Sequence, residues 1–146
     1  MFIFLDIDGV LNRREDWRIP YSLNEECIDN FARAMKGFDI RIILTSSWRK
    51  GFVSRGNQNN LPQIRALEKK LYERGLYIAG IVDKANPSRM GAIHDFLKAH
   101  PGEYIILDDD LSEYTSRPKN LYLVDCTTGI SKKDVSKIRK EISECI

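Results

Sequence analysis

The sequence has few of the residues that form disulfide frameworks or zinc sites. Its three cysteines, Cys27, Cys126 and Cys145, are an odd number and show no C-x-x-C spacing, which argues against both structures. Unpatterned thiols are typical of a reducing compartment, so we expect the protein in the cytoplasm. The only histidines, His94 and His100, have no partners at metal-ligand spacing, and we assign them no chemistry.

The chain also lacks a long apolar run and a strong excess of one charge. The opening run Phe2–Leu5 stops at Asp6, too early for a signal peptide or a membrane span, so we expect no membrane partner. A net charge of +2 does not by itself indicate nucleic acid. Basic residues nevertheless crowd two segments of the chain: Arg13, Arg14, Arg18, Arg49, Lys50 and Arg55.

The remaining composition is that of an ordinary globular protein. The 146 residues are 42% hydrophobic and 30% charged, without an internal repeat or a low-complexity segment. We therefore expect a single domain over residues 1–146.

Short apolar runs alternate with helix patterns along the chain. The runs suited to buried strands are Phe2–Leu5, Ile40–Leu44, Tyr77–Val82, Tyr104–Leu107 and Leu121–Val124. Capping residues and apolar periodicity predict helices from Asn24 to Met35, from Pro62 to Arg74, from Ser88 to before Pro101, and after Ser131. This alternation predicts a three-layer α/β fold, with a central parallel five-stranded sheet and helices on both faces.

Open α/β sheets bind ligands at the carboxyl ends of their strands, so we expect function there. Two segments that fit neither a strand nor a helix follow the first two strands, at Gly9–Leu23 and Ser46–Leu61. We expect these two loops to border the active end of the sheet.

A pair of acids follows the first strand. Asp6 and Asp8 are separated by a single residue, and Gly9 supplies a free turn. If Mg²⁺ holds a phosphate there, Asp6 can attack phosphorus to form an aspartyl-phosphate, while Asp8 protonates the leaving oxygen and later activates water. An isolated D-x-D pair is also common in surface turns and helix caps, so the context must decide.

Hydroxyl and acidic residues follow two further strands. Thr45, Ser46 and Ser47 offer groups that suit phosphate oxygens, although such residues often only cap or turn. The run Asp108–Asp110 follows the fourth strand, and repulsion among its acids favours a divalent cation such as Mg²⁺, which prefers oxygen ligands. A solvated acidic loop is the alternative.

Two cations lie between the third and fourth strands. Lys84 follows the third strand, and Arg89 falls in the first turn of a predicted helix, where the dipole does not favour positive charge. A fixed cation there can balance the carboxylates and the charge of a transferring phosphoryl group. For either residue taken singly, a solvated side chain remains the alternative.

The order of these motifs resembles that of haloacid dehalogenase (HAD) phosphatases. Over most of the chain it runs D-x-D-G-V-L-N, strand-T-S-S-W-R, a cation before a helix, and strand-D-D. More narrowly, four segments are similar to the HAD domains of Swiss Army Knife RNA-repair proteins: Thr45–Arg49, Arg89–Ile93, Tyr104–Asp110 and Thr128–Ile130.

The resemblance implies a Rossmann-like HAD fold and a role for each matching residue. Asp6 is the implied nucleophile, Asp8 the general acid and base, and Thr45 a phosphate binder. Arg89 stands at the cation position of the third motif. A lysine is more usual there across the superfamily, and Lys84 lies close by in the sequence.

The resemblance also implies a cofactor, Mg²⁺. Its ligands would be Asp6, the carbonyl of Asp8, Asp108 and Asp109. Oxygen ligands of this kind leave room for water and a substrate phosphate in the octahedron that Mg²⁺ prefers.

Many HAD enzymes that select small metabolites carry an inserted cap domain, and neither loop of this sequence is long enough for one. An open site suits the end of a polymer. We predict substrate contacts from Ser46, Trp48, Arg49 and Lys84, with tryptophan stacking a base and the cations binding phosphates. A solvated basic rim with inward-packed tryptophans is the alternative.

The function these features predict is a Mg²⁺-dependent phosphomonoesterase acting on RNA or DNA ends, in association with RNA-repair enzymes. A phosphatase of small metabolites, nucleotides or phosphoproteins would carry the same motifs. A third reading is a non-catalytic phosphate-binding or regulatory module resembling a receiver domain. Receivers place the phosphorylated acid after the third strand, however, where only Asp83 stands.

Overall fold

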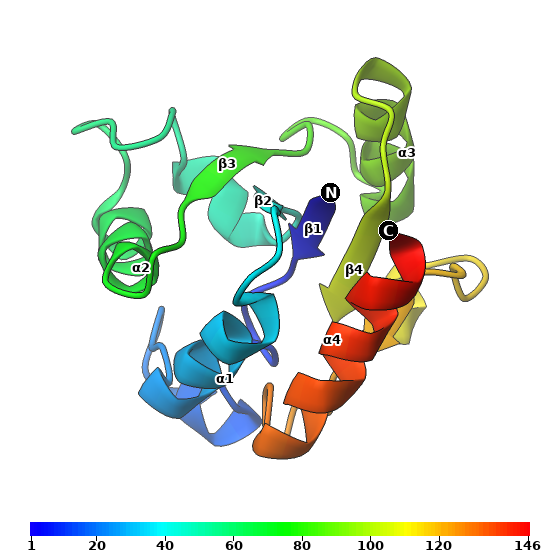
Figure 1. Cartoon of the computed structure of the whole chain (residues 1–146). Coiled ribbons are helices and arrows are strands. Elements are labelled where there is room, and N and C mark those ends of the chain that lie inside the picture. The colour runs from blue at the N-terminus through cyan, green and yellow to red at the C-terminus, as the bar shows by residue number, and fades with distance from the viewer.

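The centre of the structure is one sheet of five parallel strands (Figure 1). The computed structural model describes residues 1–146. The strands are β1 (Phe2–Leu5), β2 (Arg41–Leu44), β3 (Ile78–Ile81), β4 (Tyr104–Asp108) and β5 (Leu121–Leu123). They lie in the order β3-β2-β1-β4-β5, which puts β1 in the middle. The five predicted strands are confirmed, with each end within one residue of its expected position.

Four α-helices accompany these strands, as predicted: three connect successive strands and the fourth follows β5. They are α1 (Glu25–Met35), α2 (Pro62–Tyr72), α3 (Arg89–Ala99) and α4 (Lys132–Cys145). The side chains of Asn24 and Ser88 cap α1 and α3 by accepting hydrogen bonds from backbone N–H groups of the first turn. Helix α2 ends two residues before the expected Arg74. No helix combines the length and the apolar composition that a bilayer crossing requires.

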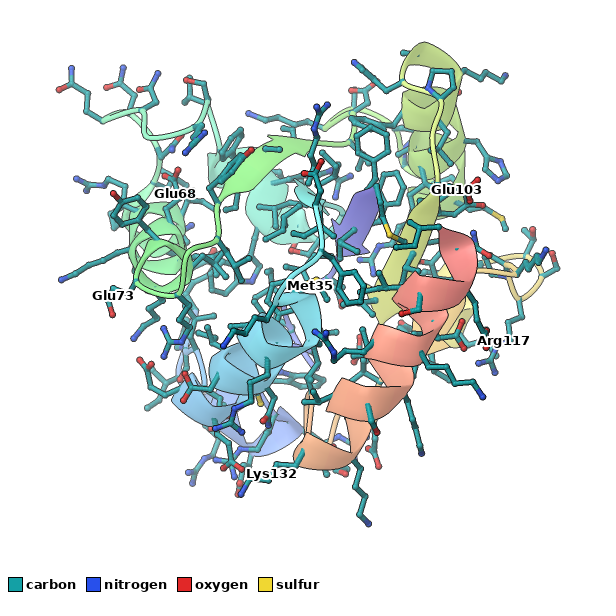
Figure 2. The ribbon with its side chains drawn as sticks, viewed as in Figure 1. Met35, Glu68, Glu73, Glu103, Arg117 and Lys132 are labelled. Carbon is teal, nitrogen blue, oxygen red and sulfur yellow. The ribbon has the colours of Figure 1, made fainter.

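Alternating side chains of β1 divide the core into two layers. Ile3 and Leu5 belong to the larger layer, which contains apolar residues of α1, α2 and α4. Phe4 belongs to the smaller layer, which is covered by α3. Figure 2 shows Met35 of α1 inside the molecule and charged side chains such as Glu73 at its periphery. Helices therefore cover both faces of the sheet, which makes the three-layer Rossmann-like architecture.

The loops after β1 and β2 contain only short 3₁₀ helices. These are η1 (Arg14–Arg18) and η2 (Ser47–Gly51), and a third, η3 (Leu111–Glu113), follows β4. No separate cap domain covers the carboxyl ends of the strands, as expected from the loop lengths.

The loop after β1 is held by a segment more than a hundred residues later in the chain. The N–H of Ile130 donates to the carbonyl of Val10 at 2.9 Å. Gly129, with φ of +60°, packs so closely that a Cβ there would lie 2.6 Å from Sγ of Cys27 and 2.9 Å from the carbonyl oxygen of Asn12. Only glycine combines this backbone conformation with this contact.

We expect Gly129→Ala to lower the free energy of unfolding by about 2 to 5 kcal/mol. Left-handed backbone costs an ordinary residue about 1–2 kcal/mol, and crowding a packed interior adds about 1–3 kcal/mol. Gly75→Ala is the matched control, because Gly75 has φ of +77° and nothing within 4 Å of its missing Cβ. Urea denaturation of both variants measures the difference, and equal losses would show that the contact with the β1 loop contributes nothing.

Candidate active site

Three strands deliver side chains in one row at their carboxyl ends. Strand β1 pairs with β2 and with β4 so that the last apolar residues of the three strands are in register. The next residue of each strand is Asp6, Thr45 or Asp108. Parallel pairing therefore brings together three groups that the sequence separates by up to a hundred residues.

Three carboxylates form a tight cluster in this row. Oxygens of Asp6, Asp108 and Asp109 lie within 4.8 Å of one another. Asp6 is 5% exposed and Asp108 is fully buried. Burial raises the pKa of Asp6 well above its usual range, and the negative charge of Asp108 raises it further. Buried negative charge of this density requires cations close by.

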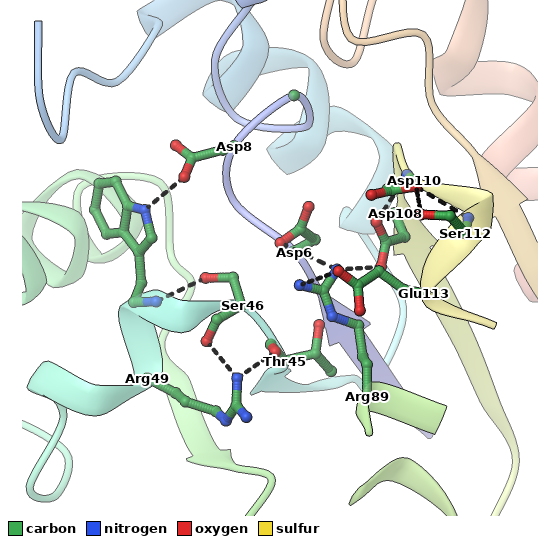
Figure 3. A network of polar contacts seen from close by, with 12 residues as sticks. Asp6, Asp8, Thr45, Ser46, Arg49, Arg89, Asp108, Asp110, Ser112 and Glu113 are labelled. Atoms are coloured by element: carbon green, nitrogen blue, oxygen red, sulfur yellow. Dashed lines mark hydrogen bonds and ion pairs between the residues drawn. The ribbon is translucent and has the colours of Figure 1, made fainter. Parts of the chain in front are cut away.

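Arg89 is the cation that the protein itself supplies (Figure 3). Its Nη1 lies 2.6 Å from Oδ2 of Asp108 and 3.6 Å from Oδ1 of Asp6. Its Nη2 lies 3.9 Å from Oε1 of Glu113, a partner that the sequence did not indicate. Lys84, the other candidate, makes no ion pair and lines a neighbouring pocket. The structure therefore places Arg89, rather than Lys84, against the acids.

Asp108 is fixed by hydrogen bonds to both of its oxygens. Oδ2 accepts from the hydroxyl of Tyr114 at 2.8 Å as well as from Arg89, and Oδ1 accepts from the N–H of Asp110 at 3.0 Å. Tyr114 escaped the sequence analysis because a lone aromatic resembles an ordinary core residue. The side chain of Asp110 caps η3, so Asp108 and Asp109 are the members of the acidic run that join the cluster.

Asp8 faces another side of the site. Its Oδ2 accepts from Nε1 of Trp48 at 3.2 Å, and its Oδ1 accepts from Nδ2 of Asn12 at 2.9 Å. Figure 3 shows the carboxylate of Asp8 turned away from Asp6 and Asp108. Oδ1 of Asn12 also accepts from the N–H of Gly9 and from Nε1 of Trp17. Asn12 is thus a positioning residue, visible in the D-x-D-G-V-L-N motif but without a predicted role.

The segment after β2 presents a hydroxyl without a partner. Oγ1 of Thr45 is buried and makes no hydrogen bond. Oγ of Ser46 accepts from the N–H of Trp48 at 3.1 Å and so caps η2. Nη1 of Arg49 donates to the carbonyl oxygens of Thr45 at 2.7 Å and Ser46 at 2.9 Å (Figure 3). A phosphate oxygen can accept from the buried Thr45 hydroxyl and would satisfy it.

Two of the residues expected to contact substrate are buried in the structure. Trp48 is only 3% exposed, and the ring of Tyr21 packs edge-on against it at 5.3 Å, so it has no free face for a base. Arg49 is 9% exposed and its Nη1 donates to the backbone, so it lies in the wall of a neighbouring pocket and not on an exposed rim. The exposed aromatic is instead Trp17, 43% exposed, which lines a pocket of about 200 Å³ together with the acids.

The site fits a hard divalent cation. The clustered donors are carboxylate oxygens, and the carbonyl of Asp8 accepts no hydrogen bond from the backbone. Gly9 has φ of +83°, and a Cβ there would collide with Oδ2 of Asp109, so the turn closes against the acids only with glycine. Asp6, Asp108, Asp109 and the Asp8 carbonyl could therefore hold Mg²⁺, which prefers such ligands.

A parallel α/β sheet with this arrangement of acids, hydroxyl and cation at its carboxyl edge defines a haloacid dehalogenase-type domain. A family model described as the HAD domain in Swiss Army Knife RNA repair proteins matches residues 2–135. The chain therefore belongs to this family, and the resemblance in its motifs is confirmed. A search of curated proteins found no match, and neither did a search of solved structures. The family supports HAD-type phosphatase chemistry at the level of the class.

We expect Asp6→Asn to stabilise the metal-free protein at neutral pH by about 1–2 kcal/mol, because it removes a buried charge from a repulsive cluster. The folded protein holds the Asp6 proton more tightly than the unfolded chain, whose pKa is near 3.8. Stability from this group is therefore present at low pH and is lost as pH rises through the folded pKa, so the advantage of the variant grows with pH above 4.

Asp125→Asn is the control for this measurement. Hydrogen bonds from Thr127 lower the pKa of the exposed Asp125, so this substitution should not stabilise the protein at neutral pH. Denaturation in EDTA at several pH values measures both variants. A destabilised Asp6→Asn protein at neutral pH would show that Arg89 already neutralises the cluster.

Proposed function

We propose that this protein is a Mg²⁺-dependent phosphomonoesterase that works through an aspartyl-phosphate on Asp6. The observation that carries the proposal is that Asp6 and Asp8 line one pocket, while the buried and unpartnered hydroxyl of Thr45 follows the strand next to that of Asp6. The phosphoryl group would sit between Asp6 and Thr45, with Arg89 balancing its charge.

In the first step an oxygen of Asp6 attacks phosphorus and forms a new P–O bond. The bond from phosphorus to the leaving oxygen breaks, and Asp8 gives that oxygen its proton. Trp48 and Asn12 fix the direction of the Asp8 carboxyl group, each by one hydrogen bond to a different oxygen. Mg²⁺ bound by the clustered oxygens supplies charge neutralisation for the phosphoryl group.

In the second step water attacks phosphorus, and Asp8 accepts the proton that water loses. The bond between phosphorus and Asp6 breaks, which releases inorganic phosphate and restores both carboxyl groups. Asp6 is nearly buried, whereas Asp8 lies toward the opening of the pocket. The side chain of Asp8 can therefore contact the leaving group in the first step and water in the second.

The proposed substrate is the phosphorylated end of a nucleic acid, RNA in the first place. The absence of a cap leaves the pocket open to a polymer end. A second pocket of about 400 Å³ adjoins the site at Asp8 and Trp17 and is lined by the exposed Ile19 and Tyr21. Aromatic and apolar surface of this kind can stack a terminal base. Family membership supports this substrate class and association with other RNA-repair enzymes.

Of the basic residues in the loop after β1, some are engaged within the chain. Arg13 pairs with Glu15 at 2.5 Å and with Asp16 at 3.2 Å. Nη2 of Arg14 donates to Sγ of Cys126. The exposed ring of Trp17, rather than a cluster of free arginines, therefore supports base recognition on this side.

We expect Asp6→Asn to abolish Mg²⁺-dependent phosphate release and to leave no phosphorylated protein. Asp8→Asn should lower turnover by about 10²- to 10⁴-fold, the usual contribution of acid–base catalysis, and should retain the phosphoryl group on Asp6. Phosphate release and intact-protein mass spectrometry measure the two effects. Asp39→Asn, an exposed change before β2, is the matched control. Phosphate release by purified Asp6→Asn protein would rule out the nucleophile.

A substrate panel tests the proposed specificity. It holds 3′- and 5′-phosphorylated RNA and DNA oligonucleotides, mononucleotides and sugar phosphates. We expect the highest kcat/KM for an RNA end. Turnover confined to small phosphates would instead identify a metabolic phosphatase with the same chemistry.

A further inference from the structure

Another polar pocket, distinct from the pocket beside Trp17, shares a wall with the candidate active site. It has a volume of about 260 Å³ and lies at the carboxyl end of β3, beside η2. Ser47, Arg89 and Glu113 line both this pocket and the pocket of the acids. A group bound here would therefore be a direct neighbour of a phosphoryl group on Asp6.

The wall of this pocket contains a buried arginine without a counter-ion. Arg49 is 9% exposed, makes no ion pair, and its Nε is buried without a hydrogen-bond partner. Only its Nη1 donates within the chain, to two backbone carbonyls. Burial lowers the pKa of Arg49, and the positive charge of Arg89 lowers it further. A buried arginine without a counter-ion destabilises the folded protein unless a bound anion neutralises its charge.

The other charges around the pocket do not neutralise it. Lys50 and Lys84 are exposed residues that line it, and neither forms an ion pair. Glu113 lies in the wall but is within ion-pair distance of Arg89 instead. Asp83 lies near Arg49, but its carboxylate accepts from the N–H of Ala85 and makes no ion pair. Three cations thus remain for a ligand.

We propose that this pocket binds a second phosphate of the substrate, namely the phosphodiester next to the terminal phosphate that Asp6 attacks. The inference rests on the proposed function and gives it a basis for selecting polynucleotides. Arg49 supplies the buried, preorganised donor, while Lys50 and Lys84 supply charge from two different loops. Charge-assisted contacts to phosphate are the usual means of positioning a nucleic acid.

The test varies the charge of that one linkage. Two oligonucleotides carry the same terminal phosphate, and the adjacent linkage is either a phosphodiester or an uncharged methylphosphonate. We expect the charged oligonucleotide to have a kcat/KM about tenfold higher, which corresponds to one charge-assisted contact. In the Lys50→Ala and Lys84→Ala variants this ratio should fall toward one. Arg49 itself is left intact, because it also supports the backbone of Thr45 and Ser46.

Lys137→Ala is the matched control, because it removes the same charge from an exposed position on α4. Its ratio between charged and uncharged linkages should equal that of the wild type. If this ratio fell equally in the Lys50→Ala, Lys84→Ala and Lys137→Ala variants, the net charge of the protein, rather than this pocket, would determine the preference for the charged linkage. That result would overturn the proposal.

Binding separates this inference from the proposed function. Fluorescence anisotropy of both labelled oligonucleotides is measured with Asp6→Asn protein, with and without the lysine substitutions. A preference for the charged linkage that depends on the lysines supports the second phosphate site. If the wild type shows this preference but releases no phosphate, the catalytic proposal fails and the binding site stands. Equal binding of both oligonucleotides overturns the site. If a nucleoside 3′,5′-bisphosphate competes as well as the oligonucleotide, the second phosphate belongs to a small molecule and the polynucleotide assignment fails.

Discussion

The contact between Arg89 and the carboxylates of Asp6 and Asp108 is the interaction on which the rest of the site depends. It allows two acids to be buried at the ends of neighbouring central strands, where their repulsion alone would oppose folding. The geometry follows from ordinary local structure. Ser88 caps α3 and thereby places Arg89 in its first turn, above β1 and β4. Local helix capping and the strand register together set the electrostatic balance of the site.

A second constraint separates the two acids of the D-x-D motif. Asp6 belongs to the cluster that a cation can complete, whereas Asp8 is held outside it by Trp48 and Asn12. Two carboxylates only two residues apart therefore have different environments: one buried among charges, the other bound to neutral donors and open to the pocket. Such a difference is what allows neighbouring acids to take different chemical roles.

The sequence predicted most of the fold and much of the candidate site, for identifiable reasons. Apolar runs and caps predicted every strand and every α-helix, and parallel pairing then explains why residues at strand ends such as Asp6 and Asp108 meet. Side-chain direction inside loops could not be predicted in this way. Trp48 faces inward to donate to Asp8, and Tyr114 returns to Asp108 from beyond η3. Hydrophobic periodicity predicts neither contact, because the irregular backbone of a loop, rather than a regular helix or strand, determines where these side chains point.

The central position of β1 also has a consequence for biosynthesis. The strand made first needs β2 on one side and β4 on the other, and the loop that follows it is completed only when Ile130 reaches Val10. Contacts of such long sequence separation form late and slowly, because a large loop must close before they contribute. While the ribosome is still adding the first hundred residues, the acids of the D-x-D motif have no finished pocket around them. The pocket around these acids is thereby completed only when nearly all of this sequence has been translated.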